Sequence, residues 1–300
     1  MAIVANSPKL HELIDPAAPI EQIVSGCGFT EGPIWNHKGG FLLFSDMPMD
    51  KRRRWSREKG VEVILDPAWK CNGMTYDAAG NLIVCEHVSS SVMREKLDGT
   101  REAVAFHYQG KYLNAPNDVC VARDGSIWFS DPSYGRWPGF GIERQKELDF
   151  EGVFRVKPDG TLELGAGDFG KPNGLCFSPD YSLLYVNDTE RAHIRVFPMN
   201  ADGSLGAGRV FAENIGEGSF ETGLVDGMKC DERGNIWVTG PGGIWVISPE
   251  GEHLGTVEFP EHTGNLTWGG PDWKTLFVAA STSVYAVQTK VAAKREPYMG

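Results

Sequence analysis

Five residues with oxygen-bearing side chains each open a copy of one recurring sequence phrase. Each copy consists of this anchor residue, a short apolar segment, a turn rich in Gly, Asp or Pro, and a second apolar segment. The oxygen-bearing anchors are Glu31, Asn72, Asn117, Asn173 and Asp226, and a sixth copy opens at Gly264. Oxygen ligands favour a hard cation such as Ca²⁺ or Mg²⁺. The two carboxylates would balance a divalent charge, and the amides of Asn117 and Asn173 would add oxygens without charge.

A structural role for the anchors is the alternative, because Asn and Asp often cap strand ends through local hydrogen bonds. Taken singly, each anchor fits such a cap better than a ligand. Five oxygen-bearing anchors at equivalent positions favour a shared site instead. Without a cation, two carboxylates facing each other in a closed channel would repel, and one would have to take up a proton.

The elements that must position these anchors are short strands. The anchors recur roughly 40 to 56 residues apart, which is typical of propeller blades. Segments rich in aromatic and β-branched residues alternate with Gly-rich turns, and helical periodicity is nearly absent. We predict an all-β fold, a six-bladed β-propeller with four-stranded antiparallel blades. An N-terminal strand within residues 18–30 is expected to complete the last blade and close the ring.

The same pattern predicts the domain organisation. Residues 1–17 are expected to form an N-terminal extension, residues 18–290 a single propeller domain, and residues 291–300 a C-terminal tail that is frayed from residue 292. The longest linker between anchors contains the segment 136–151, for which we expect a loop that covers one face and shapes a pocket.

The second strand of each phrase runs antiparallel to the first, so its end returns to the face that carries the anchors. Strand ends predicted on this face are Ser45-Asp46, Glu86-His87, Ser130-Asp131 and Asn187-Asp188. His87 is the one histidine at the predicted mouth, where a substrate contact or acid–base role and a structural polar role both stay open. Asp131 and Tyr134 are further candidates to bind substrate hydroxyl groups.

Composition excludes several function classes. The net charge of −11 and the pI near 5.2 argue against nucleic acid or an anionic membrane as a partner. No apolar run approaches the ~20 residues of a membrane span, and the N-terminus lacks a signal-peptide pattern. Six cysteines without a CxxC pair indicate a reduced, cytoplasmic protein. The one G-x-G-x-x-G match, at residues 165–170, runs directly into a strand and therefore predicts no dinucleotide site.

Four segments together carry a resemblance to a known family: TEGPIW, LNAPNDVCVARDGSIWFSDPSYG, KPNGLCFSPD and DGMKCDERGNIWV. Over roughly residues 20 to 285 the chain resembles the SMP-30/gluconolactonase/luciferin-regenerating-enzyme family, and NAPND and DPSYG resemble its bacterial gluconolactonase branch. The resemblance implies one divalent cation in the central tunnel, with Ca²⁺ expected and Mg²⁺, Mn²⁺ or Zn²⁺ as alternatives. It implies as its ligands Glu31, Asn117, Asn173 and Asp226. The family motif does not include Asn72, which we assign to substrate contact or to support of the ligands.

The resemblance further implies hydrolysis of a sugar lactone, a small-molecule substrate. We expect a monomer or a weak homo-oligomer. The cation would polarise the lactone carbonyl, and Asp226 would act as the general base on water. Two alternatives stay open: hydrolysis of another ester, an aromatic lactone or a phosphotriester, and a non-catalytic propeller that only binds a cation.

Overall fold

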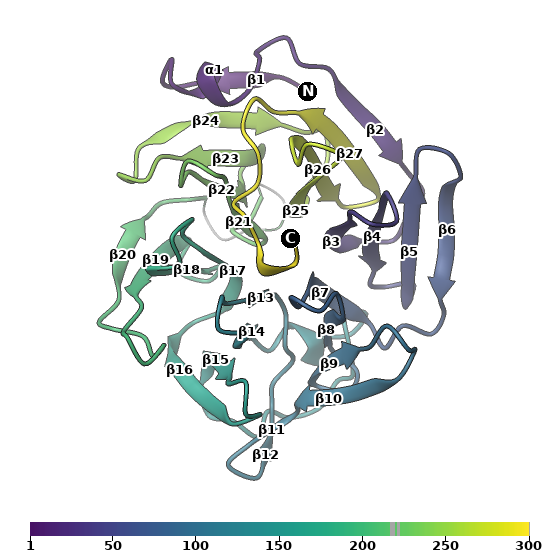
Figure 1. Ribbon diagram of the computed structural model, residues 1–300, viewed down its shortest axis with the longest axis vertical. Helices are drawn as coiled ribbons and strands as arrows, with labels where there is room; N and C mark the ends of the chain where they lie inside the picture. The colour runs from purple at the N-terminus through teal and green to yellow at the C-terminus, as the bar shows by residue number, and fades with distance from the viewer. Residues whose placement is uncertain (217–219, 221–222, 300) are drawn as a thin grey trace.

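The protein is described by a computed structural model that covers residues 1–216, 220 and 223–299. Six antiparallel sheets are arranged as blades around a central axis (Figure 1). This arrangement confirms the predicted six-bladed β-propeller. No helix among the described residues is long and apolar enough to cross a membrane.

The blades follow one another along the chain, with the innermost strand of each nearest the axis. Blade 1 comprises β3 (Thr30–Asn36), β4 (Phe41–Asp46), β5 (Lys51–Ser56) and β6 (Gly60–Leu65). Blade 2 comprises β7 (Cys71–Tyr76), β8 (Leu82–Glu86), β9 (Ser91–Glu95) and β10 (Arg101–Ala105). Blade 3 comprises β13 (Val119–Val121), β14 (Ile127–Asp131), β15 (Glu151–Val156) and β16 (Leu162–Phe169). A small hairpin, β11 (His107–Tyr108) and β12 (Lys111–Tyr112), precedes blade 3.

The second half of the ring repeats this order and then returns to the N-terminus. Blade 4 comprises β17 (Pro172–Phe177), β18 (Leu183–Asp188), β19 (His193–Pro198) and β20 (Arg209–Ala212). Blade 5 comprises β21 (Met228–Cys230), β22 (Ile236–Gly240), β23 (Gly243–Ile247), β24 (His253–Glu258) and the N-terminal β1 (Ile3–Ala5). Blade 6 comprises β25 (Thr263–Gly269), β26 (Thr275–Ala280), β27 (Ser283–Gln288) and β2 (Ile20–Val24).

Strand β2 closes the ring as predicted, because it pairs antiparallel with β27 from Ile20 opposite Val287 to Val24 opposite Val284. Residues 1–17, predicted as an N-terminal extension, pack against the propeller. Strand β1 pairs with β24, and the short helix α1 (Leu10–Leu13) buries both of its terminal leucines. Pairing and burial make these residues part of blades 5 and 6, since apolar side chains are stabilised by removal from water.

The C-terminal tail is also ordered by contacts, contrary to the expected fraying. Val291 and Lys294 are 0% and 1% exposed, and the Lys294 N–H donates to the Cys230 carbonyl over 3.0 Å. The tail ends in a 3₁₀ turn, η2 (Pro297–Met299), that lies over the central axis (Figure 1). One end of the channel is therefore covered by the tail.

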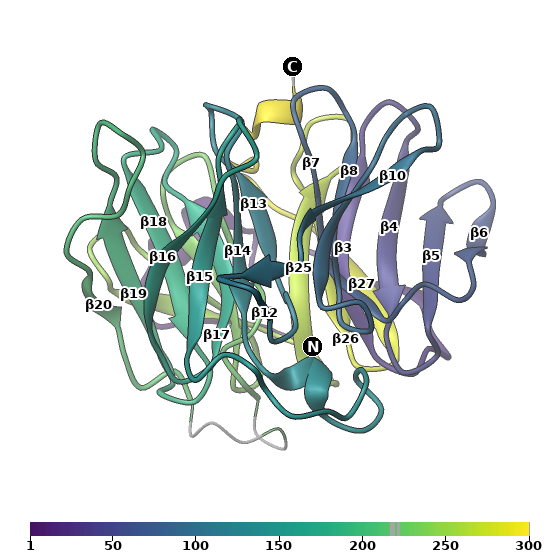
Figure 2. The same ribbon diagram turned by 90° about the horizontal axis from the view of Figure 1, so that it is seen from below.

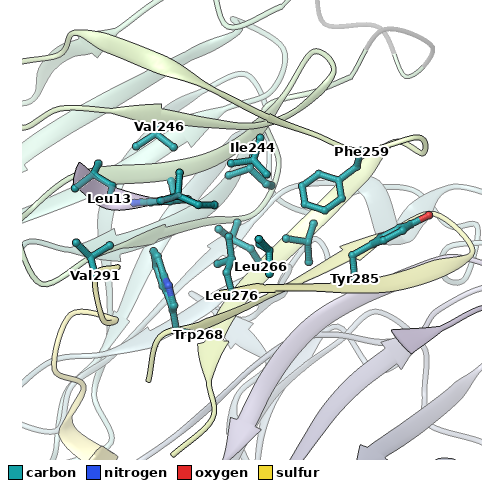
Figure 3. Close-up of a cluster of buried hydrophobic side chains, with 14 of the residues drawn as sticks. Leu13, Ile244, Val246, Phe259, Leu266, Trp268, Leu276, Tyr285 and Val291 are labelled. Carbon is teal, nitrogen blue, oxygen red and sulfur yellow. The ribbon is translucent and has the colours of Figure 1, made fainter. Parts of the chain in front are cut away.

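The hydrophobic core lies between neighbouring blades. Figure 3 shows one cluster between blades 5 and 6, which Leu13 from α1 and Val291 from the tail also enter. In this cluster the indole of Trp268 packs edge-to-face on that of Trp237, with ring centroids 5.3 Å apart. Side chains alternate between the faces of a strand, so each blade presents apolar residues to both of its neighbours.

Glycines after the anchors allow the inner strands to approach the axis closely. The Gly73 N–H donates to the Asn117 carbonyl over 2.8 Å, and the Gly174 N–H donates to the Asp226 carbonyl over 3.0 Å. A side chain at Gly174 would overlap that carbonyl. Consecutive anchors are thus linked by their backbones, which brings their side chains together at one end of the channel.

Candidate functional site

A cavity of about 360 Å³, here called the pocket, opens at the anchor end of the central channel. Its lining residues are Phe29, Glu31, Met47, Asn72, His87, Asn117, Tyr134, Trp137, Phe140, Asn173, Thr189, Phe220, Leu224 and Asp226. Figure 2 shows the teal turn η1 (Tyr134–Arg136), which carries Tyr134, on the side of the disc opposite the C-terminus. The structure therefore gathers all four predicted metal ligands with three of the four predicted substrate residues.

Hydrogen bonds hold both predicted carboxylate ligands in place. The Gly32 N–H and the Asn265 side-chain amide donate to Glu31 Oε2 over 2.8 and 3.0 Å, so neither of these bonds uses Oε1. The backbone of Asp226 is held on both sides. Its N–H donates to Thr239 Oγ1 over 2.7 Å, and its carbonyl accepts from Asn187 Nδ2 over 2.6 Å.

Burial makes ionisation of these carboxylates costly. It raises the pKa of Glu31 to about 7, against the opposing hydrogen bonds from Gly32 and Asn265. Burial, and then the negative charges of Glu31 and Asp118, raise the pKa of Asp226 well above its usual range. A bound divalent cation would remove this repulsion and allow both carboxylates to ionise.

The amide of Asn173 is oriented to present an oxygen. The Thr189 hydroxyl donates its proton to the Val225 carbonyl over 2.6 Å, so toward Asn173 it can only accept. Asn173 Nδ2 donates to it over 3.3 Å. Asn173 Oδ1 is buried and has no hydrogen-bond partner among the described residues. Such an orphaned oxygen beside two carboxylates suits a hard cation.

Asn117, from blade 3, is the fourth predicted metal ligand. Its backbone is fixed by two hydrogen bonds, from its N–H to the Ser130 carbonyl over 2.9 Å and from Gly73 N–H to its carbonyl. Within the described ranges, no three His, Cys, Asp or Glu side chains converge closely enough to hold a metal. The predicted donors contain only two carboxylates, so the two amides are essential to the fit.

A charged pair that sequence reasoning missed lies beside these ligands. Asp118 follows Asn117 directly, and its carboxylate is 3.3 Å from the ammonium of Lys229, three residues after Asp226. The charge of Asp118 raises the pKa of Glu31, whereas that of Lys229 lowers it. The spacing within the phrases could have indicated the pair, because Asp118 directly precedes β13 and Lys229 lies on β21, two inner strands of the ring.

His87 lies in the pocket wall with both ring nitrogens engaged. Nδ1 is 2.8 Å from the Phe140 carbonyl oxygen, and Nε2 is 3.3 Å from Asn72 Nδ2. Burial, as the main cause, lowers the pKa of His87 to about 4. A neutral ring with two partners is poorly suited to acid–base catalysis near pH 7, so the structural polar role that the sequence left open is favoured.

Asp131 does not reach the pocket, which corrects its prediction as a substrate residue. It is fully buried, and its Oδ2 accepts a hydrogen bond from the Asn114 N–H over 2.8 Å. Burial raises its pKa to about 8 despite the hydrogen bonds from Asn114 and Ala115. Asp131 therefore fixes the chain that leads into the inner strand of its blade.

Two other carboxylates at predicted strand ends act in the same way. Asp46 Oδ1 accepts from the Gly28 N–H over 2.8 Å, and Asp188 Oδ2 accepts from the Gly170 N–H over 2.8 Å. Since adjacent residues of an extended chain point to opposite sides, the residue after each carboxylate faces the pocket instead. Met47 and Thr189 occupy these positions.

Sequence reasoning also missed an apolar wall. It consists of Phe29, Met47, Trp137, Phe140, Phe220 and Leu224. The rings of Phe29 and Phe140 meet edge-to-face with centroids 5.9 Å apart. Of the predicted covering loop, Trp137 and Phe140 line the pocket, and Lys70 Nζ donates to the Gly139 carbonyl over 2.8 Å. Two aromatic residues in a Gly- and Pro-rich loop are the signal that could have indicated this wall.

The chain is similar to several known proteins. The family model described as the SMP-30/Gluconolactonase/LRE-like region matches residues 29–282. A gluconolactonase of Zymomonas mobilis is 35% identical over 308 residues, which cover 96% of this chain and 86% of that protein. The pentonolactonase XacC of Haloferax volcanii is 26% identical over 269 residues, covering 86% of this chain and 83% of that protein.

Among solved structures, the gluconolactonase XC5397 of Xanthomonas campestris superposes with a TM-score of 0.87. It is 32% identical and covers 96% of this chain and 95% of its own. The family model spans most of the chain, and the Zymomonas relative is similar over nearly all of it. The chain therefore belongs to the SMP-30/Gluconolactonase/LRE-like family.

Proposed function

We propose that this protein hydrolyses a sugar lactone and uses one divalent cation held by Glu31, Asn117, Asn173 and Asp226. One observation carries the proposal. The two carboxylates with raised pKa values and the orphaned oxygen of Asn173 meet in one pocket. The gluconolactonase and pentonolactonase relatives support a sugar lactone as the substrate class.

The chain's own residues account for the proton transfers. A bound divalent cation supplies Lewis-acid polarisation of the lactone carbonyl and stabilises the negative charge that develops on its oxygen. Asp226 takes a proton from the attacking water as the new C–O bond forms. When the ring C–O bond breaks, Asp226 returns that proton to the departing ring oxygen, which gives the open hydroxy acid. The backbone hydrogen bonds of Asp226 hold it in position for both steps.

The remaining lining residues suit a hydroxylated ring. Asn72 and Tyr134 provide polar groups, with His87 beside them, and the apolar wall can pack against the C–H face of a sugar ring. We propose Ca²⁺ as the ion, because the donors are all oxygens. The six cysteines are free, which supports the reducing cytoplasm as the compartment.

The proposal is tested by following acid release from D-glucono-1,5-lactone at constant pH, with the uncatalysed rate subtracted. Protein treated with a chelator should lose turnover, and added Ca²⁺, Mg²⁺, Mn²⁺ or Zn²⁺ should restore it in a defined order. Asp226→Ala should remain folded and lose essentially all turnover. A rate that is insensitive to the chelator, or near-normal turnover in Asp226→Ala, would exclude this mechanism.

An aromatic lactone is a second candidate substrate, because the apolar wall offers ring contacts beyond those a sugar requires. Phe29 and Phe140 form an edge-to-face pair at this wall, and Trp137 packs edge-to-face on Tyr134 with centroids 5.0 Å apart. Dihydrocoumarin in the same assay distinguishes the candidates. A kcat/KM for dihydrocoumarin above that for gluconolactone would favour the aromatic substrate.

A further inference from the structure

The Phe140 carbonyl determines which nitrogen of His87 carries a proton. His87 Nδ1 lies 2.8 Å from that oxygen, which can only accept a hydrogen bond. Nδ1 is therefore the protonated nitrogen of the neutral ring, and Nε2 is left as a bare acceptor. The lowered pKa of His87, about 4 because of burial, agrees with a neutral ring at pH 7.

The bare Nε2 in turn determines the orientation of the Asn72 amide. Asn72 Nδ2 lies 3.3 Å from His87 Nε2, and only the NH₂ group of an amide can donate to that nitrogen. Asn72 Oδ1 must then face away from His87. This oxygen is buried and has no partner among the described residues. The Asn72 amide therefore has one acceptor, Oδ1, whose hydrogen-bonding capacity is not used within the described residues.

The surrounding chain prevents the His87 ring from turning. His87 is 1% exposed, and a methyl group added to Gly135 would lie 2.6 Å from its Cγ atom. The Gly135 carbonyl accepts from the Ile142 N–H over 3.0 Å, which ties η1 to the loop that supplies Phe140. Lys70 Nζ holds the same loop through its bond to the Gly139 carbonyl. The loop that carries Phe140 therefore determines which ring nitrogen of His87 faces Asn72.

The other polar groups beside Asn72 are already engaged. The Thr189 hydroxyl donates to the Val225 carbonyl and accepts from Asn173. Tyr134 hydrogen-bonds to Thr189. Contacts within the blades thus orient the amide of Asn173. The amide of Asn72 is instead oriented through His87 by the loop that carries Phe140. Apart from the proposed metal ligands, Asn72 Oδ1 is the buried acceptor without a partner among the described lining residues.

We propose that His87 is a positioning residue that turns Asn72 Oδ1 toward the pocket as the acceptor for a hydroxyl group of the substrate. The inference rests on the proposed lactonase function and adds a basis for substrate selection. A lactone hydroxyl donates to Oδ1, whereas a lactone without hydroxyl groups leaves this oxygen buried and unpaired. Sites built to bind a hydroxyl group reject analogues that lack it for this reason.

The experiment compares two six-membered lactones, D-glucono-1,5-lactone and δ-valerolactone, which has no hydroxyl groups. The measured quantity is the ratio of their kcat/KM values in wild type, Asn72→Ala, His87→Phe and the double variant. Asn72→Ala should lower the ratio by about 10- to 100-fold. His87→Phe should lower it by a similar factor, mainly through KM for gluconolactone. In the Asn72→Ala background, His87→Phe should have no further effect, because its action passes through Asn72.

A matched control is His193→Phe, which replaces a partly buried histidine on β19 that does not line the pocket. This variant should keep the wild-type ratio. If His87→Phe does not fold, as judged by circular dichroism, His87→Leu carries the same expectation. An unchanged ratio in Asn72→Ala, or an equal effect of the His87 substitution in both backgrounds, overturns the inference.

Calorimetric titration with Ca²⁺ separates substrate binding from metal binding. The Kd for Ca²⁺ in Asn72→Ala and His87→Phe should stay within about 3-fold of wild type, since their effect is on the substrate. A Kd more than about 10-fold weaker in Asn72→Ala would make Asn72 a metal ligand and overturn the inference. If wild type hydrolyses neither lactone, the proposed function itself fails, which is a different result from an active enzyme without the expected discrimination.

Discussion

The two ends of the central channel are built from the same inner strands and yet differ in character. At the anchor end, buried oxygens lack partners and two carboxylates repel each other beside an open pocket. At the far end, the C-terminal tail covers the axis and leaves a cavity of only about 30 Å³. There the Lys294 ammonium donates to the Tyr181 hydroxyl over 3.0 Å and pairs with Glu296 over 2.8 Å.

Side chains at the far end stabilise the fold, whereas those at the anchor end are available to bind a ligand. At the far end Lys294 is paired with Tyr181 and Glu296, and Tyr298 packs against Tyr76 with ring centroids 5.7 Å apart. Unsatisfied groups at the anchor end carry an energetic cost that a ligand can remove. Substitutions at the two ends should therefore affect different quantities.

Among the changes that compare the two ends, Glu31→Gln at the anchor end should have the largest effect, a loss of activity. This change keeps the side-chain shape but removes one of the two proposed carboxylate ligands. We expect kcat/KM for gluconolactone to fall by about 10²–10⁴-fold and calorimetric Ca²⁺ affinity to fall with it. Glu296→Gln, the same change at the far end, should leave kcat/KM within about 3-fold. Similar losses of kcat/KM in the two variants would show that the two ends of the channel do not differ in their importance for activity.

Deletion of residues 292–300 should affect stability instead. The deletion exposes the far end of the channel and removes the buried Lys294 together with Glu296, which leaves the Tyr181 hydroxyl without the Lys294 ammonium. We expect the free energy of unfolding in urea to fall by about 3 kcal/mol, with kcat per folded molecule unchanged. A folded deletion variant with a tenfold lower kcat would show that the tail also supports the pocket.

The pH dependence of stability should distinguish metal-free from metal-loaded protein. The pKa of Glu31 is raised from about 4.5 to about 7 in the folded protein, so the folded state binds this proton more tightly than the unfolded state. Stability from this group is fully present below pH 4.5 and is lost as the pH rises through 7. Relative to Glu31→Gln, the melting temperature of chelator-treated protein should therefore fall from pH 5 to pH 7.5.

Saturating Ca²⁺ should reverse that trend, because protons compete with the cation for the carboxylates. Glu31→Gln provides the control, since its metal-free melting temperature should depend less on pH over the same interval. A metal-free protein whose melting temperature rises between pH 5 and pH 7.5 relative to that of Glu31→Gln would contradict the proposed strain at the anchor end.

The smallest expected effect is that of Asp131→Asn. Asp131 lies near the anchor end but outside the pocket, and an Asn carbonyl can still accept the Asn114 N–H. We expect less than about 1 kcal/mol of destabilisation and a kcat/KM within 3-fold of wild type in the lactone assay. A loss of activity close to that of Glu31→Gln would show that Asp131 contributes to the substrate site after all.

Much of the fold could be predicted because the repeated phrases encode it locally. Alternating apolar segments and Gly-rich turns specify the strand pairs of each blade, and equivalent anchors must then lie at equivalent places around the axis. Strand β2 does not pair with a segment close to it in sequence. Its partner is β27, which closure of the ring brings beside it. The roles of residues 1–17 and of the tail were missed, because their partners lie in blades 5 and 6 and at the axis, distant in sequence.

The convergence of the anchors could likewise be predicted from the sequence, but the other features of the site could not. Repetition by itself indicated that the five oxygen-bearing anchors share one end of a channel, since symmetry converts equal spacing in sequence into convergence in space. Only the tertiary structure decided that Asp131 faces the backbone rather than the pocket, that aromatic rings form a wall, and that Asn72 lies within hydrogen-bond distance of His87. These features depend on side-chain direction and on contacts between segments distant along the chain, which no local pattern records.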